Sequence, residues 1–348
     1  MTQRGFFDED DRLIRLSQLG DPLEKLTAVI DWEKFRPILE KVFLKEERGI
    51  GGRPPWDYIL MFKIILLQSW YNIADDKTEY MINDRLSFQR FLGLSLGDKV
   101  PDSKTIWLYR DKLSISGAYK ELFNLFKIQM ELQGIITRGG SLIDATFVEA
   151  PRQRNTRDEN KEIKEGKTPE EWEKPENKAK LCQKDLDARW TKKNNESHYG
   201  YKDHVKVDRD SKMIVDFTVT DASVHDSQEI LELIDEKDKE VYADSAYVGE
   251  ELHKKIIEKN PKVRLSINEK SYRNNPLTDE QKASNKIKSK IRARVEHVFG
   301  YMSNSMGGTY IRCIGIRRAR CEITFKNLAY NLSRFAYLIH VPKVPISA

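Results

Sequence analysis

Cysteine is scarce in this sequence of 348 residues, which contains Cys182, Cys313 and Cys321 and no others. Three thiols at such wide spacing cannot form the disulfide framework of a small secreted domain, and they lack the paired spacing of a zinc site. Free structural thiols explain them better. A reducing compartment is therefore expected.

Long apolar segments are also lacking. The most apolar stretch, residues 59–70, contains Lys63 and is much shorter than the roughly 20 residues that a membrane-spanning helix requires. Residues 1–11 are acidic towards their end, whereas a secretory signal needs a basic region followed by an apolar core. These two absences predict a cytoplasmic protein with no membrane partner.

The chain does have length and a concentrated basic charge. It is long enough for two domains, because domains usually contain about 100–200 residues. The net charge of +5 is modest, but many basic residues gather in one strip that contains a single acid, Glu296. The strip consists of Lys286, Lys288, Lys290, Arg292, Arg294, Arg312, Arg317, Arg318 and Arg320. Such a strip suits a phosphate backbone, whereas an ordinary solvated helix face usually mixes both signs of charge.

The first third of the chain shows the spacing of amphipathic or buried helices. Helices are predicted at 23–44 with a break at Pro37, and at 56–71, 79–92, 104–113 and 118–132, with a loop at 51–55. The helices on either side of the turn at 93–102 resemble a helix-turn-helix. Its candidate DNA contacts would be Lys104, Trp107, Arg110 and Lys112. A small helical bundle with Trp107 in its core explains the same pattern. Both interpretations predict a helical N-terminal domain at residues 1–135, and the helix-turn-helix would make it a DNA-binding domain.

The stretch Ser141–Val148 places one carboxylate, Asp144, inside an apolar segment that follows Gly139 and Gly140. Alternation and β-branched residues predict a strand here. A carboxylate in such a strand is unfavourable to bury unless a cation or hydrogen-bond donors compensate it. Asp144 therefore requires a partner elsewhere in the chain.

Two later stretches also carry isolated acids. Val241–Tyr247 repeats the pattern of an aspartate, Asp244, at the end of an apolar strand, and Ile291–Gly300 sets Glu296 on a basic helix. Three carboxylates in this order suggest a site for a divalent metal ion.

The position of Glu296 on its helix agrees with that suggestion. The apolar stripe of the helix consists of Ile287, Ile291, Val295, Val298 and Met302. At about 100° per residue, Glu296 lies roughly 130° from the centre of this stripe, with Arg292 one turn before it. The alternative is a simple surface ion pair with Arg292, which would contribute only about 0.3–0.5 kcal/mol.

The order of elements after residue 140 is strand, insertion, two strands, and then helix and strand in alternation, ending with a helix. The insertion, Pro151–Ser197, is rich in charge and poor in aliphatic residues, so it is expected to lie on the surface, either mobile or helical, without a core. Four further strands are predicted at 198–207 and 213–220, at a segment that ends at Asp244, and at 262–267. Together with Ser141–Val148 they predict a mixed five-stranded sheet with helices on both faces.

This order, with Asp144 on the first strand, Asp244 at the end of the fourth and Glu296 on the last helix, is similar to the ribonuclease-H-like fold of DDE transposases. The quoted stretches, together with Tyr199–Lys202, resemble bacterial insertion-sequence transposases of the "five" family, within the "four/five" superfamily. Gly52-Arg53-Pro54-Pro55 and the helices after it resemble the N-terminal domain of the same proteins. The resemblance covers roughly Gly52 to Leu338.

The resemblance implies an α/β catalytic domain of ribonuclease-H-like fold at 136–340, with the insertion at about 151–197, preceded by the all-α domain. It places the catalytic and metal-binding triad on Asp144, Asp244 and Glu296, and the arginine that precedes the glutamate on Arg292. Ser289 and Ser303 stand where the superfamily has a tyrosine and a lysine.

The implied activity is that of a DNA transposase. It would bind the terminal inverted repeats of an insertion sequence, cleave the strands and join their 3′-hydroxyl ends to target DNA, with two Mg²⁺ ions, or Mn²⁺ as a substitute, held by the three carboxylates. Its partners would be double-stranded DNA of the element ends and the target, and further copies of itself in a homodimer or higher oligomer. Its location would be the bacterial cytoplasm, at the nucleoid. The implied DNA contacts are Lys104, Arg110, Arg292, Arg294, Arg317 and Arg318.

Two alternatives follow from the same residues. A domesticated ribonuclease-H-like nuclease would cleave DNA without strand transfer. A non-catalytic DNA-binding protein, in which the carboxylates are structural, would bind DNA without regard to metal.

Overall fold

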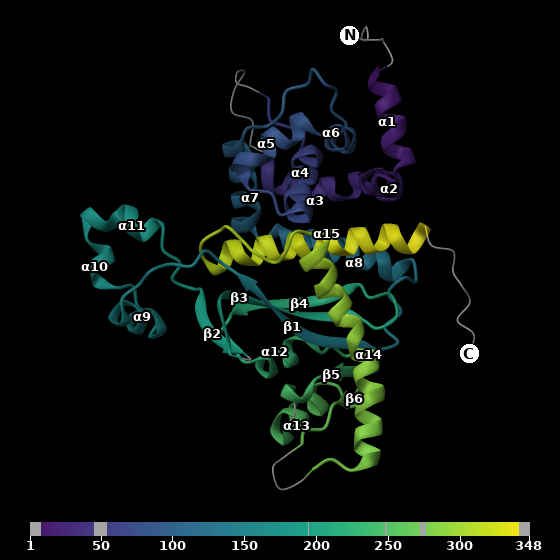
Figure 1. The fold of residues 1–348 in the computed structure, drawn as a ribbon, viewed down its shortest axis with the longest axis vertical. Coiled ribbons are helices and arrows are strands. Elements are labelled where there is room, and N and C mark those ends of the chain that lie inside the picture. Colours follow the sequence, from purple (N-terminus) through teal and green to yellow (C-terminus); the bar gives the residue numbers. More distant parts are fainter. Residues whose placement is uncertain (1–7, 45–53, 194, 248, 272–275, 341–348) are drawn as a thin grey trace. The chain divides into compact units, whose positions relative to one another are not determined.

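The computed structural model describes residues 8–44, 54–193, 195–247, 249–271 and 276–340. Part of the predicted loop at 51–55, namely Gly51, Gly52 and Arg53, lies outside these residues. The chain forms two compact units (Figure 1): unit 1 comprises Met1–Phe126 with Thr324–Ala348, and unit 2 comprises Lys127–Ile323. The catalytic domain predicted from the sequence instead runs without interruption from 136 to 340.

Unit 1 is helical in its described part. Its elements are α1 (Asp8–Gln18), α2 (Pro22–Val29), η1 (Trp32–Phe35), α3 (Arg36–Phe43), α4 (Tyr58–Tyr71), α5 (Asp75–Asp84), α6 (Leu86–Leu92), α7 (Ser103–Ser116), most of α8 (Ala118–Leu132) and the last part of α15 (Ile316–His340). The helix predicted at 23–44 is three elements, and Pro37 lies in the first turn of α3 rather than at a break. The helix predicted at 79–92 is divided at Arg85, whose backbone is extended.

Helix α4 is the centre of unit 1, because it is apolar on nearly every side. The Asp57 carboxylate caps its start by accepting a hydrogen bond from the Leu60 N–H at 2.9 Å. Asn72 ends it in the left-handed conformation. On α4, Phe62 packs against Phe325 of α15 with ring centroids 6.1 Å apart. The last part of α15 therefore supplies core to unit 1, although the predicted order of elements ends with the helix that carries Glu296.

Unit 2 contains a six-stranded mixed sheet. Its strands are β1 (Ser141–Glu149), β2 (Arg189–Lys193), β3 (Glu196–Asp208), β4 (Ile214–Asp221), β5 (Glu240–Ala243) and β6 (Arg264–Ile267). The order is β2-β3-β1-β5-β6, and β4 pairs with β3. Strand β3 is antiparallel to β1, β2 and β4, whereas β1, β5 and β6 are parallel.

The predicted count of five strands is wrong, because β2 lies in the segment assigned to the insertion. Its sequence, Arg-Trp-Thr-Lys-Lys, has no apolar alternation, and it forms only by pairing with residues 196–200 of β3. At the end of this pairing, Gly200 has φ 144°, and a Cβ there would collide with the Val148 carbonyl oxygen. Glycine at this position thus allows β1 and β3 to approach in the register that sets Asp144 opposite Val205.

The two faces of the sheet have separate cores. Ile143, Val241 and Ala243 pack with residues of α12 (Asp226–Leu233) and α13 (Glu250–Lys259) on one face. Val148, Tyr201 and their neighbours pack on the other face with residues 311–323. Because side chains alternate along a strand, Asp144 points to the face opposite Ile143. That is also the face of Tyr242, and hence of Asp244.

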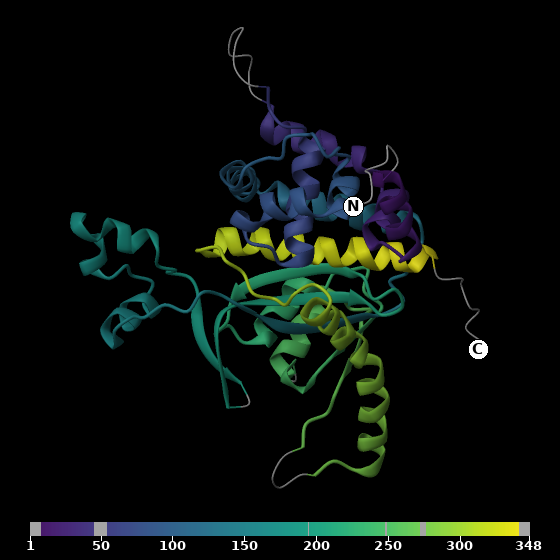
Figure 2. The same cartoon turned by 45° about the horizontal axis from the view of Figure 1, so that its top comes forward.

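The insertion is helical, with α9 (Arg157–Lys164), α10 (Glu170–Glu173), η2 (Pro175–Asn177) and α11 (Lys178–Cys182). The expectation that it builds no core is wrong. Trp172 is fully buried, and its indole N–H donates to Glu159 at 2.6 Å. Both views show this segment standing to one side of the sheet (Figures 1 and 2). Its two ends meet where Gln153 and the backbone of Asp185 exchange two hydrogen bonds of 2.8 Å.

Helix α14 (Asp279–Asn304) is the last helix before α15, and it carries the predicted apolar stripe. Its second half packs on the sheet through Val295, Val298 and Met302, whereas Ile287 in the first half is 65% exposed. The predicted apolar stripe is therefore buried only in its second half. Figure 2 shows the first half extending away from the sheet. In the described part of the chain, no helix is both long and apolar enough to cross a membrane.

Candidate active site

Asp144 lies on β1, and Asp244 directly follows the neighbouring strand β5, close enough for its charge to act on Asp144. Strands β1 and β5 are parallel, and Ser141 and Leu142 pair with Val241 and Tyr242. The same offset, continued by two residues, sets Asp144 beside Asp244 on one face of the sheet. Strand β5 ends at Ala243, so Asp244 follows immediately after its carboxyl end. The sheet therefore brings together two carboxylates that are a hundred residues apart.

Asp144 is nearly buried, with 15% of its side chain exposed. Burial raises the pKa of the Asp144 carboxyl from 3.8 to about 6, and the neighbouring charge of Asp244 acts in the same direction. The Ala145 N–H, which donates to Oδ1 at 2.8 Å, and the Arg292 guanidinium oppose this rise. Even with these partners, the ionised carboxylate of Asp144 is less stable than it would be in water. An additional positive charge at the site would stabilise it.

Asp244 is held by the short turn that follows β5, η3 (Ser245–Tyr247). Its Oδ1 accepts a hydrogen bond from the Ala246 N–H at 2.7 Å. Tyr247 is buried, and its hydroxyl has no hydrogen-bond partner in the described structure. Burial first, and then the charges of Asp226, Asp144 and Asp244, raise the pKa of Tyr247, so the phenol stays protonated. Sequence reasoning missed Tyr247, although it closes the motif that contains Asp244.

Glu296 reaches this edge from α14 through Arg292. The Arg292 guanidinium donates to Asp144 Oδ2 at 2.8 Å through Nη1, and to Glu296 Oε1 at 3.0 Å through Nη2. The ion pair between Arg292 and Glu296 that the sequence offers as an alternative is thus present. The same guanidinium also links Glu296 to β1, which a surface pair would not do.

The rotation of α14 is fixed by the turn between β3 and β4. Arg294 donates to the Arg209 carbonyl oxygen at 2.7 Å and lies 3.6 Å from Asp210. Lys212 Nζ lies 2.8 Å from His297 Nδ1. The side chain of His297 is exposed. No local sequence pattern predicts these anchors, since they depend on tertiary contacts with residues 85 positions away.

The residues fit a divalent cation in charge and in chemistry. The donors at this edge are carboxylate oxygens, which suit Mg²⁺ or Mn²⁺ and disfavour Zn²⁺. Within the described ranges, no three His, Cys, Asp or Glu side chains are gathered closely enough to hold a metal ion. Glu296 is turned towards Arg292, and with 57% of its side chain exposed it can rotate. Asp144 and Asp244 are in place, and Glu296 would have to leave Arg292 to join them.

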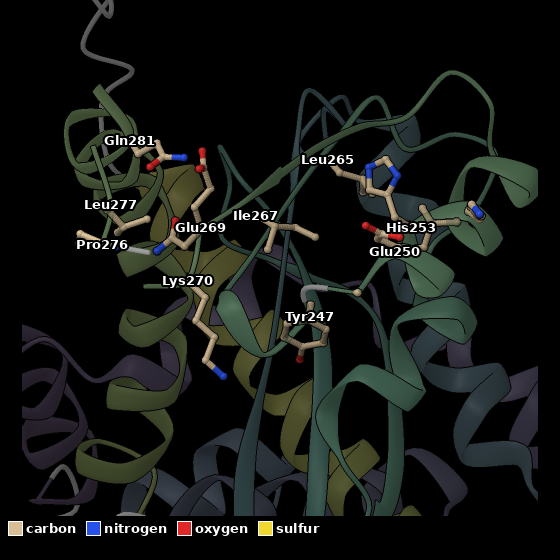
Figure 3. A pocket seen from close by; sticks show the side chains of 14 residues that line it. Tyr247, Glu250, His253, Leu265, Ile267, Glu269, Lys270, Pro276, Leu277 and Gln281 are labelled. Carbon is tan, nitrogen blue, oxygen red and sulfur yellow. The ribbon is translucent and has the colours of Figure 1, made fainter. Parts of the chain in front are cut away.

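A cavity of about 670 Å³ opens next to this edge, and Tyr247 is the residue that the two share. Figure 3 shows Tyr247 and Ile267 between Glu250 and His253 on one side and the segment leading into α14 on the other. None of the three predicted catalytic acids lines this cavity.

The remaining predicted DNA contacts differ in their surroundings. In unit 1, Lys104 and Trp107 are exposed on α7. Arg110 is not, because its guanidinium binds both oxygens of Asp75, at 2.6 and 2.7 Å, and Gln68 at 3.0 Å. Arg110 therefore links α7 to α4 and α5, and we leave it out of the DNA contacts proposed below.

In unit 2, the basic strip is divided between two helices, and Arg312 lies in the segment that joins them. Its first part, up to Arg294, belongs to α14, whereas Arg317, Arg318 and Arg320 lie at the start of α15. Arg292 and Arg294 both have protein partners, as described above. Arg317 is exposed and Arg318 is half-buried.

Two family models match the chain. Residues 137–332, more than half of its length, match the transposase DDE domain, and residues 11–112 match the transposase domain DUF772. A solved structure, the cryo-electron-microscopy structure of the piggyBac transposase synaptic complex with hairpin DNA, is similar with a TM-score of 0.47 and 12% sequence identity. That similarity covers 92% of this chain and 75% of the other.

Proposed function

Because this chain belongs to the transposase DDE domain family, and is therefore an enzyme that acts on DNA, we propose that Asp144, Asp244 and Glu296 are its catalytic acids. In this proposal the protein binds the terminal inverted repeats of an insertion sequence and cleaves the DNA strands there. It then joins the freed 3′-hydroxyl ends to target DNA.

One observation carries the proposal. Two aspartates that are far apart in the sequence come together where β5 ends beside β1, and a glutamate of α14 is tied to one of them through Arg292. The strand order supports a ribonuclease-H-like fold for unit 2, since an antiparallel group of β3 and β4 precedes the parallel strands β5 and β6 beside a central β1.

The three carboxylates of Asp144, Asp244 and Glu296 would hold divalent metal ions, Mg²⁺ or Mn²⁺. When bound, such ions activate the attacking water and stabilise the leaving 3′-oxygen. The Ala145 and Ala246 N–H groups orient the two aspartates through one oxygen each, and so leave the other oxygens for ligands. Arg292, one turn from Glu296, is available to a phosphate once its present partners are taken.

DNA is the proposed partner of both units. Unit 1 would recognise the element ends, with Lys104 and Trp107 on the exposed side of α7. Arg294, Arg317 and Arg318 would add contacts to phosphate that do not depend on sequence. Cleavage of two ends in one complex requires two active sites, so we propose a homodimer or a higher oligomer.

The test is strand cleavage of a labelled element end by alanine variants. Asp144→Ala, Asp244→Ala and Glu296→Ala should each lower the cleavage rate by 10³-fold or more, on the order expected when metal ligation is lost, and should change DNA affinity little. Glu251→Ala is the matched control, because Glu251 is an exposed acid of unit 2 whose ion pair is with Lys255. Wild-type cleavage by one of the three variants would remove that residue from the site. Cleavage without joined products would instead identify a nuclease, and metal-independent binding without cleavage would identify a non-catalytic protein.

A further inference from the structure

Arg292 occupies a special position among the basic residues of α14, because its single guanidinium spans two of the proposed catalytic acids. It binds Asp144 Oδ2 and Glu296 Oε1 through separate nitrogens. Asp144 Oδ1 is already taken by the Ala145 N–H. The guanidinium therefore covers the carboxylate oxygen of Asp144 that would otherwise face a bound ion.

The surroundings of Arg292 are not those of a purely structural arginine. Its Nε is buried and has no hydrogen-bond partner in the described structure, and 22% of the side chain is exposed. Arg294, two residues further on, instead donates to the Arg209 carbonyl oxygen and approaches Asp210, outside the acidic group. Of these two arginines, only Arg292 has both of its hydrogen-bond partners among the proposed metal ligands.

Electrostatics explains why a cation is present there. A buried carboxylate without a compensating charge is strongly unfavourable, and Asp144 has Asp244 beside it as a second negative charge. In the protein without metal, Arg292 supplies the compensation. A divalent ion would supply more charge at the same oxygens, so the guanidinium and the ion compete for Asp144 and Glu296.

A displaced Arg292 would remain close to the reaction. It is fixed to α14 one turn before Glu296, and that helix is held by the turn between β3 and β4. A guanidinium is planar and binds two phosphate oxygens at once, which an ammonium group cannot do. The acids that bind the ion thus release a phosphate-binding group at the place where the phosphate must lie.

We propose that Arg292 exchanges partners on metal binding: it neutralises Asp144 and Glu296 in the metal-free protein and passes to the phosphate of bound DNA when divalent ions replace it. This inference rests on the proposed function, since it takes the three acids as metal ligands. It adds that the free protein binds metal weakly because of its own arginine.

The first experiment measures Mn²⁺ binding to the free full-length protein by calorimetry, without DNA. Arg292→Gln should raise the affinity for Mn²⁺ by roughly tenfold or more. A cation beside a carboxylate lowers the affinity of that carboxylate for another positive charge by at least about one logarithmic unit, and the substitution removes this cation. Lys290→Gln, the matched control at an exposed position of the same helix, should leave the Mn²⁺ affinity unchanged. The Mn²⁺ affinity of Arg292→Lys, whose ammonium group can reach only one carboxylate, should lie between those of the wild type and Arg292→Gln. This variant replaces Arg292→Gln in the test if the glutamine variant does not fold.

The outcomes separate the exchange from the proposed function. Unchanged or weaker Mn²⁺ binding by folded Arg292→Gln protein, with binding abolished by Asp144→Asn, would overturn the exchange and leave the acidic site in place. Mn²⁺ binding that survives Asp144→Asn would place the ion elsewhere and overturn the site itself.

The second experiment measures the salt dependence of DNA binding, in Ca²⁺ and in chelator. Arg292→Gln should reduce the slope of log affinity against log salt by about one phosphate contact in Ca²⁺ and should leave it unchanged in chelator. Arg294→Gln should have the same effect in both conditions. A reduction by Arg292→Gln in chelator would mean that the arginine reaches phosphate without exchange, and the proposal would fail.

Discussion

The pKa of the Asp144 carboxyl is unusually high for an aspartate. Its pKa in the folded protein is about 6, whereas the ordinary value is 3.8. Between these values the folded protein binds a proton more readily than the unfolded chain does. The contribution of Asp144 therefore favours folding as the pH falls through 6, and it is lost as the pH rises again.

This sign gives a prediction for the metal-free protein. The free energy of unfolding of the wild type, relative to Asp144→Asn, should increase by on the order of 1–3 kcal/mol between pH 7.5 and pH 5. Urea unfolding in chelator at a series of pH values measures it. The variant is needed as reference because burial lowers the pKa of His204 to about 4, which acts against folding in acid over part of the same range. A difference that stays flat across pH 6 would contradict the assignment to Asp144.

The sequence predicts the identity of the site residues better than it predicts their contacts. The order Asp144, Asp244, Glu296 and the place of Arg292 one turn before Glu296 can be predicted, because they depend on motif and helical spacing. The contact of Arg292 with Asp144 cannot, since it joins residues 148 positions apart and depends on how α14 lies on β1. The prediction that Arg110 contacts DNA loses its basis for a related reason. It took the side chain to be exposed, whereas the guanidinium forms an ion pair with Asp75.

The insertion that contains α9–α11 is separate from the sheet. It leaves β1 and returns at β2, and its neck is closed by Gln153 and Asp185. The core of the neighbouring sheet face contains no residue between Ala150 and Ala188. The sheet should therefore fold without the insertion.

This expectation can be tested by replacing residues 155–183 with a short glycine-serine linker. The thermal midpoint should change by only a few degrees, which corresponds to about 1 kcal/mol or less for a chain of this size. Asp185→Ala in the full chain is the contrasting variant. Its buried carboxylate accepts from the Tyr201 hydroxyl at 2.7 Å and from the Gly315 N–H at 3.1 Å, so its loss should lower the midpoint further. A collapse of near-ultraviolet signal in the linker protein would show that the insertion is part of the fold.

Elements were predicted well where the pattern of apolar residues is clear, and less well elsewhere. Helix α4 and strands β1 and β3 fall where periodicity places them, within a few residues. Strand β2 is charged and forms only by pairing, so no local pattern announces it. Helix α15 was missed because polar residues, among them Thr324, Asn327 and Asn331, are buried on it and interrupt the expected apolar stripe.

At the scale of the whole molecule, unit 1 is built from two separate stretches of the chain, and its core depends on both. Its core includes Phe325, Leu328, Leu332 and Phe335, all from the last part of α15 and all buried. Phe126 and Phe335 pack with ring centroids 5.8 Å apart. A fragment that ends at residue 135, the boundary that the sequence suggests, lacks these side chains and leaves their partners exposed.

We therefore expect residues 8–126 alone to melt without a cooperative transition. The same residues joined by a flexible linker to 324–340 should melt cooperatively, because each restored phenylalanine contributes on the order of 3–5 kcal/mol. Circular dichroism and calorimetry measure both. The matched control is the linked protein with Phe325→Asp and Phe335→Asp, which should resemble the fragment. Cooperative melting of residues 8–126 by themselves would contradict the role given to α15.

The same feature has a consequence for synthesis on the ribosome. The segment that completes unit 1, from Thr324 onward, is translated only after all of 127–323. At roughly 5–20 residues per second, the helices of the first 126 residues wait on the order of 10–40 s for their last partner. A chain released early would carry neither a finished unit 1 nor, before α14 is made, a complete acidic site. The DNA contacts proposed for unit 1 can therefore form only in molecules whose catalytic unit has already been synthesised.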